Sequence, residues 1–237
     1  MLRLIGICLV AMIALTSTAK ADLNDVDQAT FDAMIKEYIE ANPEVLRDAL
    51  MRLAQREADE ARNDALNLLY MDEGDPVLGN PDGDIVIYEF TDYNCGYCKR
   101  VFGPIQQVLA EDGNIRFVVK EFPILSQTSL FAAQAGIAAA AQGVFADYHA
   151  NMMTSRSAVS IESIMQAAGD AGADIEQLQM DMNSDAVNAI INRTRQAASR
   201  LEISGTPGLV IGKTVVPGAI SAAELKNLIA TERASNG

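Results

Sequence analysis

Apolar residues recur at steps of three and four along residues 31–70, and this spacing predicts two helices. The first helix ends at Asn42, because Pro43 is tolerated at the first position of a new helix but not inside an old one. The second helix carries a narrow stripe of Leu and Ala between charged faces. Such a stripe buries little by itself, so the helix packs either on its own chain's main domain or on copies of itself.

Gly, Pro, Asn and Asp are concentrated in residues 72–84, which predicts a flexible linker and a domain boundary. After it come a predicted strand, helix and strand, then an Ala-rich helical block with breaks near 155–160 and 169–174, then two short strands and a helix. These elements are expected at 85–90, 95–110, 115–122, 129–200, 208–211, 213–216 and 221–231. They predict an α/β thioredoxin-like fold with a helical insertion at about 126–203, preceded by an N-terminal helical segment.

The N-terminus has the pattern of a secretory signal peptide. A short basic start precedes the apolar run Leu4–Leu15, and Ala19-Lys20-Ala21 is a small-x-small cleavage site. The run is too short to span a bilayer comfortably, although a retained membrane anchor is the alternative. We therefore expect a signal peptide at 1–21, a helical segment and linker at 22–78, a catalytic domain at 79–237, and a soluble protein exported to the periplasm.

Composition excludes one class of partner. The 237 residues include 18 basic and 32 acidic side chains, a net charge of −14, so electrostatic binding to nucleic acid is not expected. Of the three cysteines, one lies inside the predicted signal peptide, and the mature chain keeps two cysteines and one histidine.

Those two cysteines form the motif Cys95-Gly96-Tyr97-Cys98, placed after a predicted strand and at the start of a predicted helix. Unpaired N–H groups and the helix dipole stabilise a thiolate there, so Cys95 is the expected exposed nucleophile and Cys98 the shielded resolving thiol. A structural disulfide is a poor alternative, because so short a loop constrains the unfolded chain little. Zinc is another, but four ligands are lacking, so we expect no metal and no cofactor.

Further candidates lie on the neighbouring predicted strands. Glu89 and Lys120 occupy apolar runs, where burial would let them pair or exchange protons with Cys98, whereas on an alternating strand they would face solvent. Thr206-Pro207 precedes an apolar strand; the bond is either an ordinary edge feature or a cis bond turned toward a neighbouring site.

Residues 90–100 (FTDYNCGYCKR), 119–125 (VKEFPIL) and 205–208 (GTPG) resemble the DsbA-like thiol–disulfide oxidoreductases. The chain is most similar to the branch that contains the suppressor-of-copper-sensitivity protein ScsC, in which the segment Asn42-Pro43-Glu44-Val45 before a long helix is also typical. The resemblance implies that Thr206-Pro207 is a cis-proline loop facing the disulfide. It also implies that Glu89 is the family's buried acid and Lys120 its partner.

The best-known oxidase of this family has Pro-His between its cysteines, where this chain has Gly96-Tyr97. A tyrosine adds no positive charge, so we expect a less strongly oxidising disulfide. Some ScsC-like relatives are oligomeric isomerases held together by N-terminal helices, so a homo-oligomer through residues 31–70 is one expectation here.

The expected activity is disulfide exchange on unfolded or misoxidised exported proteins, in concert with a membrane thiol–disulfide redox partner. The direction, oxidase or isomerase, stays open. A copper-binding module using the two thiols and methionines such as Met152, Met153, Met180 and Met182 is an alternative, and a non-catalytic oligomeric scaffold is another. His149 is interpreted as a packing or helix-surface residue.

Overall fold

The computed structural model describes residues 27–236, in which two compact units are divided between Gln55 and Arg56. The signal peptide expected at 1–21 lies outside these residues. The N-terminal unit contains α1 (Gln28–Ala41) and the first part of α2 (Pro43–Tyr70). The C-terminal unit contains the rest of α2 and then β1 (Val77–Gly79), β2 (Ile85–Thr91), α3 (Gly96–Glu111), β3 (Ile115–Glu121), α4 (Gln127–Ala141), α5 (Phe145–Thr154), α6 (Ile161–Asp170), α7 (Ile175–Met182), α8 (Asp185–Arg200), β4 (Gly208–Ile211), β5 (Thr214–Pro217) and α9 (Ala222–Asn236).

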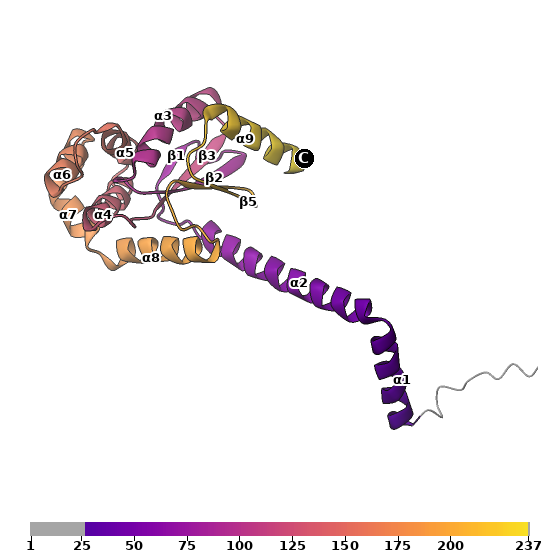
Figure 1. Cartoon of the computed structure of the whole chain (residues 1–237). Coiled ribbons are helices and arrows are strands. Elements are labelled where there is room, and N and C mark those ends of the chain that lie inside the picture. The colour runs from indigo at the N-terminus through magenta and orange to yellow at the C-terminus, as the bar shows by residue number, and fades with distance from the viewer. Residues whose placement is uncertain (1–26, 237) are drawn as a thin grey trace, which may run out of the picture. The chain divides into compact units, whose positions relative to one another are not determined.

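Within the described residues, five strands form one sheet in the order β1-β3-β2-β4-β5; Figure 1 labels β1, β2, β3 and β5. β2 and β3 are parallel and α3 forms their crossover, while the other neighbouring pairs are antiparallel. A helical block from α4 to α8 lies between this first β-α-β unit and the closing β-β-α unit. The expected thioredoxin-like fold with a helical insertion is therefore confirmed.

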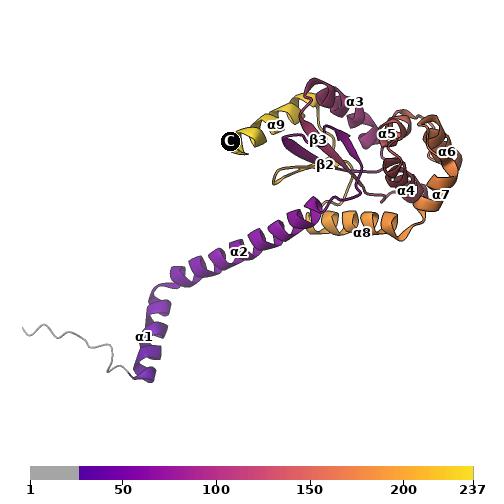
Figure 2. The ribbon, with the colours of Figure 1, turned by 180° about the vertical axis from the view of Figure 1, so that it is seen from behind.

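Each face of the sheet is covered by a different pair of helices. One face packs on α3 and α9, and the other packs on α8 and the end of α2, an arrangement visible from both sides (Figures 1 and 2). Side chains alternate between the faces, so Ile87 and Phe117 lie under α3, whereas Phe90 and Val118 lie on the side of α8. The central strands have no polar face toward solvent, which explains their nearly continuous apolar sequence.

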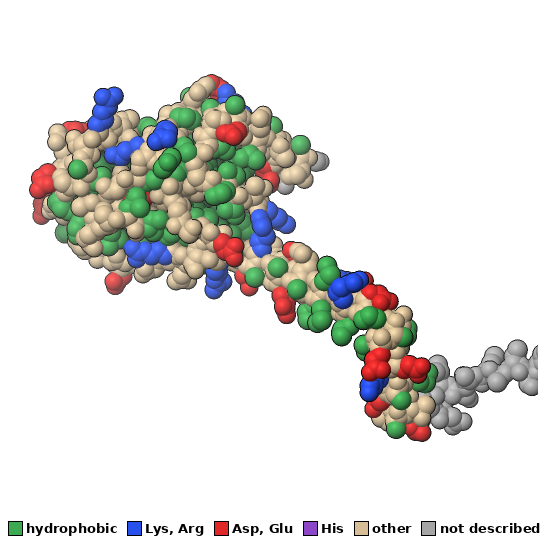
Figure 3. All heavy atoms as spheres, viewed as in Figure 1, with side chains coloured by type: hydrophobic (Ala, Val, Ile, Leu, Met, Phe, Trp, Pro, Cys, Tyr) green, Lys and Arg blue, Asp and Glu red, His purple; other side chains and the backbone are tan. Residues whose placement is uncertain are grey.

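The N-terminal unit buries little. α1 begins at the N-cap Asp27, whose carboxylate accepts the Thr30 N–H, and every residue of α1 is exposed. Apolar side chains lie at the surface of α1 and of the first part of α2 (Figure 3). The exposed large apolar residues are Phe31, Met34, Ile35, Tyr38, Ile39, Val45, Leu46, Leu50, Met51 and Leu53.

The C-terminal unit begins earlier than the expected boundary at residue 79. Ala65, Leu66 and Leu69 from the last turns of α2 are buried in the core beside α8. Burying a leucine side chain contributes about 1.5–3 kcal/mol, so these turns are part of the folded domain.

The segment 72–84 is also not the flexible linker that its composition predicts. It contains β1, which pairs with β3, and two of its acidic residues make ion pairs with the same strand. Asp72 contacts Arg116 at 2.6 Å and the buried Asp75 contacts Lys120 at 2.6 Å. The three-residue strand escaped prediction because Gly, Pro and Asp surround it.

Candidate active site

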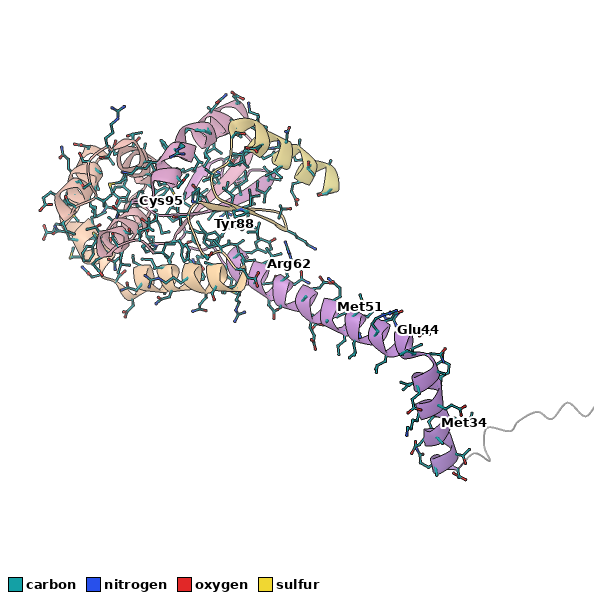
Figure 4. All side chains as sticks on the ribbon, viewed as in Figure 1. Met34, Glu44, Met51, Arg62, Tyr88 and Cys95 are labelled. Carbon is teal, nitrogen blue, oxygen red and sulfur yellow. The ribbon has the colours of Figure 1, made fainter. Side chains whose placement is uncertain are left out.

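Cys95, which Figure 4 labels, is the N-cap of α3. Its backbone is extended, with φ −79° and ψ 113°, and α3 begins at Gly96. The N–H of Cys98 donates to the Cys95 sulfur at 3.4 Å. This position offers a sulfur the unpaired amide groups of the first turn, which favour a negative charge.

Both cysteines are free thiols; Cys98 is shielded as expected, whereas Cys95 is more covered than expected. Cys95 is 6% exposed and Cys98 is 1% exposed. Cys95 is therefore the more exposed of the two thiols, as expected, but most of its surface is covered. The cover includes the loop before β4, where the Cys95 thiol donates to the carbonyl oxygen of Thr206 at 3.2 Å. The Thr206-Pro207 bond is cis, so the expected isomer at this position is confirmed.

Asp92 ties the turn before Cys95 to the loop that follows β3. Its carboxylate, which is 1% exposed, accepts the N–H groups of Asn94, Ile124 and Leu125 at 2.8–3.0 Å. It also accepts the Ser129 hydroxyl at 2.7 Å. Ile124 and Leu125 are thereby held with their apolar side chains at the surface.

Glu89 lies on the α3 side of the sheet, six residues before Cys95, and is 3% exposed. Burial raises the pKa of Glu89 to about 8. Burial also raises the pKa of the Cys98 thiol, and the charge of Glu89 acts in the same direction. The structure thus places the predicted acid where it interacts with Cys98.

Lys120 is not the partner of Glu89. In the parallel pair β2–β3, Glu89 lies opposite Val119 and Phe90 lies opposite Lys120, so Glu89 and Lys120 point to opposite faces of the sheet. Lys120 is fully buried and donates to Asp75, which Arg193 also contacts at 3.0 Å. Burial lowers the pKa of Lys120 and Asp75 opposes that shift. The expectation that Lys120 exchanges protons with Cys98 is therefore wrong.

Three buried residues that sequence reasoning left out of the site lie on the α3 side. The hydroxyl oxygen of Tyr93 lies within hydrogen-bond distance of two buried groups, 2.8 Å from Glu121 Oε1 and 3.0 Å from Nδ1 of His149. Glu121 and Glu89 lie on the same face of the sheet, which becomes clear only once the strand register is known. His149 is packed among aromatic rings, as the packing interpretation expected.

Metal-binding arrangements are not evident in the described part of the chain. Between residues 27 and 236, no group of three or more His, Cys, Asp and Glu side chains is placed to hold a metal ion. Met152, Met153 and Met182 are buried in the core, whereas Met180 is exposed. Core packing accounts for the three buried methionines.

Two known families match this chain. Residues 71–231 match the family described as Thioredoxin, and residues 27–60 match the family described as Copper resistance protein ScsC N-terminal domain. The first match covers most of the C-terminal unit, including Cys95, Cys98 and the Thr206-Pro207 loop.

Solved structures agree with these families. A thioredoxin-like oxidoreductase from Silicibacter pomeroyi DSS-3 is 37% identical, with a TM-score of 0.68 over 70% of this chain and 96% of that chain. Proteus mirabilis ScsC in a transitional conformation is 25% identical, with a TM-score of 0.67 over 89% and 100%. The thiol-disulfide exchange protein α-DsbA2 from Wolbachia pipientis is 25% identical, with a TM-score of 0.68 over 76% and 97%.

Curated relatives include much longer proteins. The Na(+)/H(+) antiporter NhaA 1 of Mycolicibacterium gilvum (strain PYR-GCK) is 30% identical over 158 residues, which are 65% of this chain and 26% of that protein. The chain thus spans about a quarter of the length of the curated relatives it matches. Across residues 27–236, no helix has both the length and the apolar character that crossing a membrane requires.

A dithiol at a helix N-terminus, beside a cis-proline loop on a thioredoxin-like sheet, defines the class of protein. The chain belongs to the thioredoxin-like family. Within that family it belongs to the DsbA-like branch and is similar to ScsC.

Proposed function

We propose that this chain catalyses thiol–disulfide exchange on the cysteines of exported proteins, with Cys95 as the nucleophile and Cys98 as the resolving thiol. One observation carries the proposal. The Cys95 sulfur sits at the start of α3, where it accepts the Cys98 N–H and lies 3.2 Å from the Thr206 carbonyl oxygen. A thiolate formed there is stabilised and lies beside a backbone edge that can receive an extended substrate.

The exchange proceeds in two displacements. The Cys95 thiolate attacks one sulfur of a substrate disulfide, forming a mixed disulfide and releasing the other substrate sulfur as a thiolate. Cys98, after losing its proton to the ionised form of Glu89, attacks the Cys95 sulfur and releases the second substrate thiolate. The substrate is then reduced and Cys95–Cys98 is oxidised; the reverse sequence oxidises a substrate dithiol.

For the direction we propose isomerisation by a self-associated chain. The exposed apolar residues of α1 and the first part of α2 support this, because a surface of that kind usually has a partner. Several tethered dithiols would hold one misoxidised substrate while its disulfides rearrange. A membrane thiol donor would keep Cys95 and Cys98 reduced in this case, whereas an oxidase would be recharged by a membrane oxidant.

The redox state in cells separates these directions. We expect acid quenching followed by alkylation to find Cys95 and Cys98 mostly reduced. A mostly oxidised pair would instead indicate an oxidase.

We also propose export to the periplasm, supported by the signal-peptide pattern of residues 1–21. The purified periplasmic protein should begin at Asp22. A protein recovered with Met1 intact would contradict cleavage.

Trapping tests the proposed chemistry. Cys98→Ser removes the resolving thiol, so the variant should accumulate mixed disulfides with exported proteins on Cys95. They should appear on a nonreducing gel and vanish on reduction. Cys95→Ser is the matched control and should trap none. Trapping by the control in place of Cys98→Ser would reverse the assigned roles.

A further inference from the structure

A buried chain of hydrogen bonds runs from β3 through the active-site turn to α5. It joins Glu121 to Tyr93 and Tyr93 to His149, over 2.8 and 3.0 Å. Glu121 and Tyr93 are 0% exposed and His149 is 1% exposed. Tyr93, the middle member, lies two residues before Cys95, so the chain passes directly beside the redox motif.

The second carboxyl oxygen of Glu121 has no such partner. Among the described residues, Oε2 of Glu121 is a buried atom without a hydrogen bond. An ionised carboxylate there would carry a full charge stabilised by only one neutral donor, the Tyr93 hydroxyl, and burying a charge under those conditions is expensive. A protonated Glu121 leaves only a neutral carbonyl oxygen unpaired, at a much smaller cost.

The hydrogen bonds along the chain are compatible with this form. The Tyr93 hydroxyl has one hydrogen and two polar neighbours. If Glu121 holds a proton, Glu121 donates to Tyr93 and Tyr93 donates to Nδ1 of a neutral His149, so each hydrogen on the chain has an acceptor. Burial lowers the pKa of His149 to about 3, so the imidazole is neutral at pH 7.

Among the described residues, the charges that act most strongly on Glu121 are negative. The titratable groups on its side of the sheet are Glu89 from β2, Asp92 and Tyr93 from the turn after β2, and Tyr148 and His149 from α5, while the ion pair of Asp75 with Lys120 lies on the opposite face. Burial raises the pKa of Glu121 well above its ordinary value. A hydrogen bond donated by Tyr93 to the ionised form opposes this shift, and the nearby acids reinforce it.

α4 closes the remaining space. A Cβ atom on Gly136 would lie 2.6 Å from Glu121 Oε1 and 3.1 Å from the Tyr93 hydroxyl oxygen. Only glycine allows α4 to pack this closely, which keeps other groups away from the carboxyl.

We propose that Glu121 keeps its proton at neutral pH and donates it to Tyr93, acting as a positioning residue for the turn before Cys95 without adding a second negative charge near Cys98. The positioning rests on the proposed function, because it concerns the geometry of disulfide exchange, whereas the protonation does not. An ionised Glu121 would share its sheet face with Glu89 and oppose formation of the Cys98 thiolate.

Infrared spectroscopy of the reduced full-length protein tests the protonation. The difference spectrum of wild type minus Glu121→Gln, at about pH 7, should contain the carbonyl stretch of one protonated carboxylic acid. Tyr93→Phe should shift this band, because the acid loses its acceptor. The matched control is Tyr148→Phe, which removes another fully buried hydroxyl, one that donates to the Ala132 carbonyl, and should leave the band in place. A carboxylate band instead of the acid band in the difference spectrum would overturn the proposal.

The pH profile of the resolving step tests the positioning. Glu121→Gln, a neutral mimic, should leave the midpoint of this pH profile within a few tenths of a pH unit of the wild-type value. If Glu121 were ionised in the wild type, removing its charge beside Glu89 would lower the midpoint by about one pH unit or more. Glu121→Leu cannot hold Tyr93 and should slow the step by about tenfold or more. A downward shift in Glu121→Gln, or an unchanged rate in Glu121→Leu, would refute the positioning. If wild type exchanges no disulfides, the proposed function fails while the infrared result still decides the protonation.

Discussion

At the scale of single residues, Glu89 makes the stability of the domain depend on pH. Its pKa rises from 4.5 to about 8 on burial, so the folded protein binds this proton more tightly than the unfolded chain. Ionising Glu89 therefore lowers the free energy of unfolding progressively from about pH 4.5 to about pH 8, by at most about 5 kcal/mol. Below that range the penalty is absent, and above it the penalty is constant.

Glu89→Gln removes this titration. Relative to wild type, we expect its free energy of unfolding to increase between about pH 4.5 and about pH 8 and then to level off. Urea unfolding of the reduced proteins across this range measures the difference. A difference that does not vary with pH would mean that Glu89 has an ordinary pKa in the folded protein.

Asp92 is the second residue with a clear expected effect. Asp92→Asn places an amide donor against backbone N–H groups that now donate to a carboxylate, so it should cost about 1–3 kcal/mol. Hydrogen exchange at Ile124 and Leu125 should accelerate. Ser129→Ala, which removes a single bond to the other oxygen, is the control and should leave these two amides protected. Equal protection of the two amides in both variants would mean that the Asp92 carboxylate does not hold the loop that follows β3.

At the scale of elements, hydrophobic periodicity predicted most of the fold. β2, α3, β3 and the closing β4, β5 and α9 each have a long enough pattern of their own. β1 was missed because a strand of three residues is too short to show an alternation of apolar and polar positions. The break at Gly143, where φ is +76°, was hidden in an Ala-rich run.

The site was predictable where it is local in sequence. Cys95, Cys98 and the Thr206-Pro207 loop belong to short motifs, whereas the partners of buried side chains depend on strand register. Because β2 and β3 are buried on both faces, their sequences do not alternate and do not reveal which face Lys120 occupies.

The ion pairs between segment 72–75 and β3 can be compared directly. Lys120–Asp75 and Arg116–Asp72 have the same 2.6 Å separation, but the first pair is fully buried and the second is partly exposed. Asp75→Asn should destabilise the protein by about 3–5 kcal/mol, because it leaves Lys120 buried without its counter-charge. Asp72→Asn should cost about 1 kcal/mol or less. Chemical unfolding of both variants measures the contrast, and equal losses would contradict it.

At the scale of the whole molecule, the division after Gln55 changes where the self-association segment should be cut. A variant starting at Gly79 would lose most of β1 and the buried residues Leu66 and Leu69, so its failure would be uninformative. A variant starting at Arg56 keeps the entire C-terminal unit.

The Arg56 variant should be monomeric in light scattering, while the mature chain should form an oligomer at about tens of micromolar. Both should react with disulfides through Cys95, but the truncated chain should lose most of its ability to refold a protein with scrambled disulfides, because linked dithiols act together on one substrate. The full-length double variant Ile35→Lys with Leu50→Lys is the matched control: it charges two exposed apolar positions and leaves Cys95 and Cys98 unchanged. It should behave like the truncation. A monomeric mature chain that refolds the scrambled protein as well as the Arg56 variant does would refute self-association as the basis of isomerase activity.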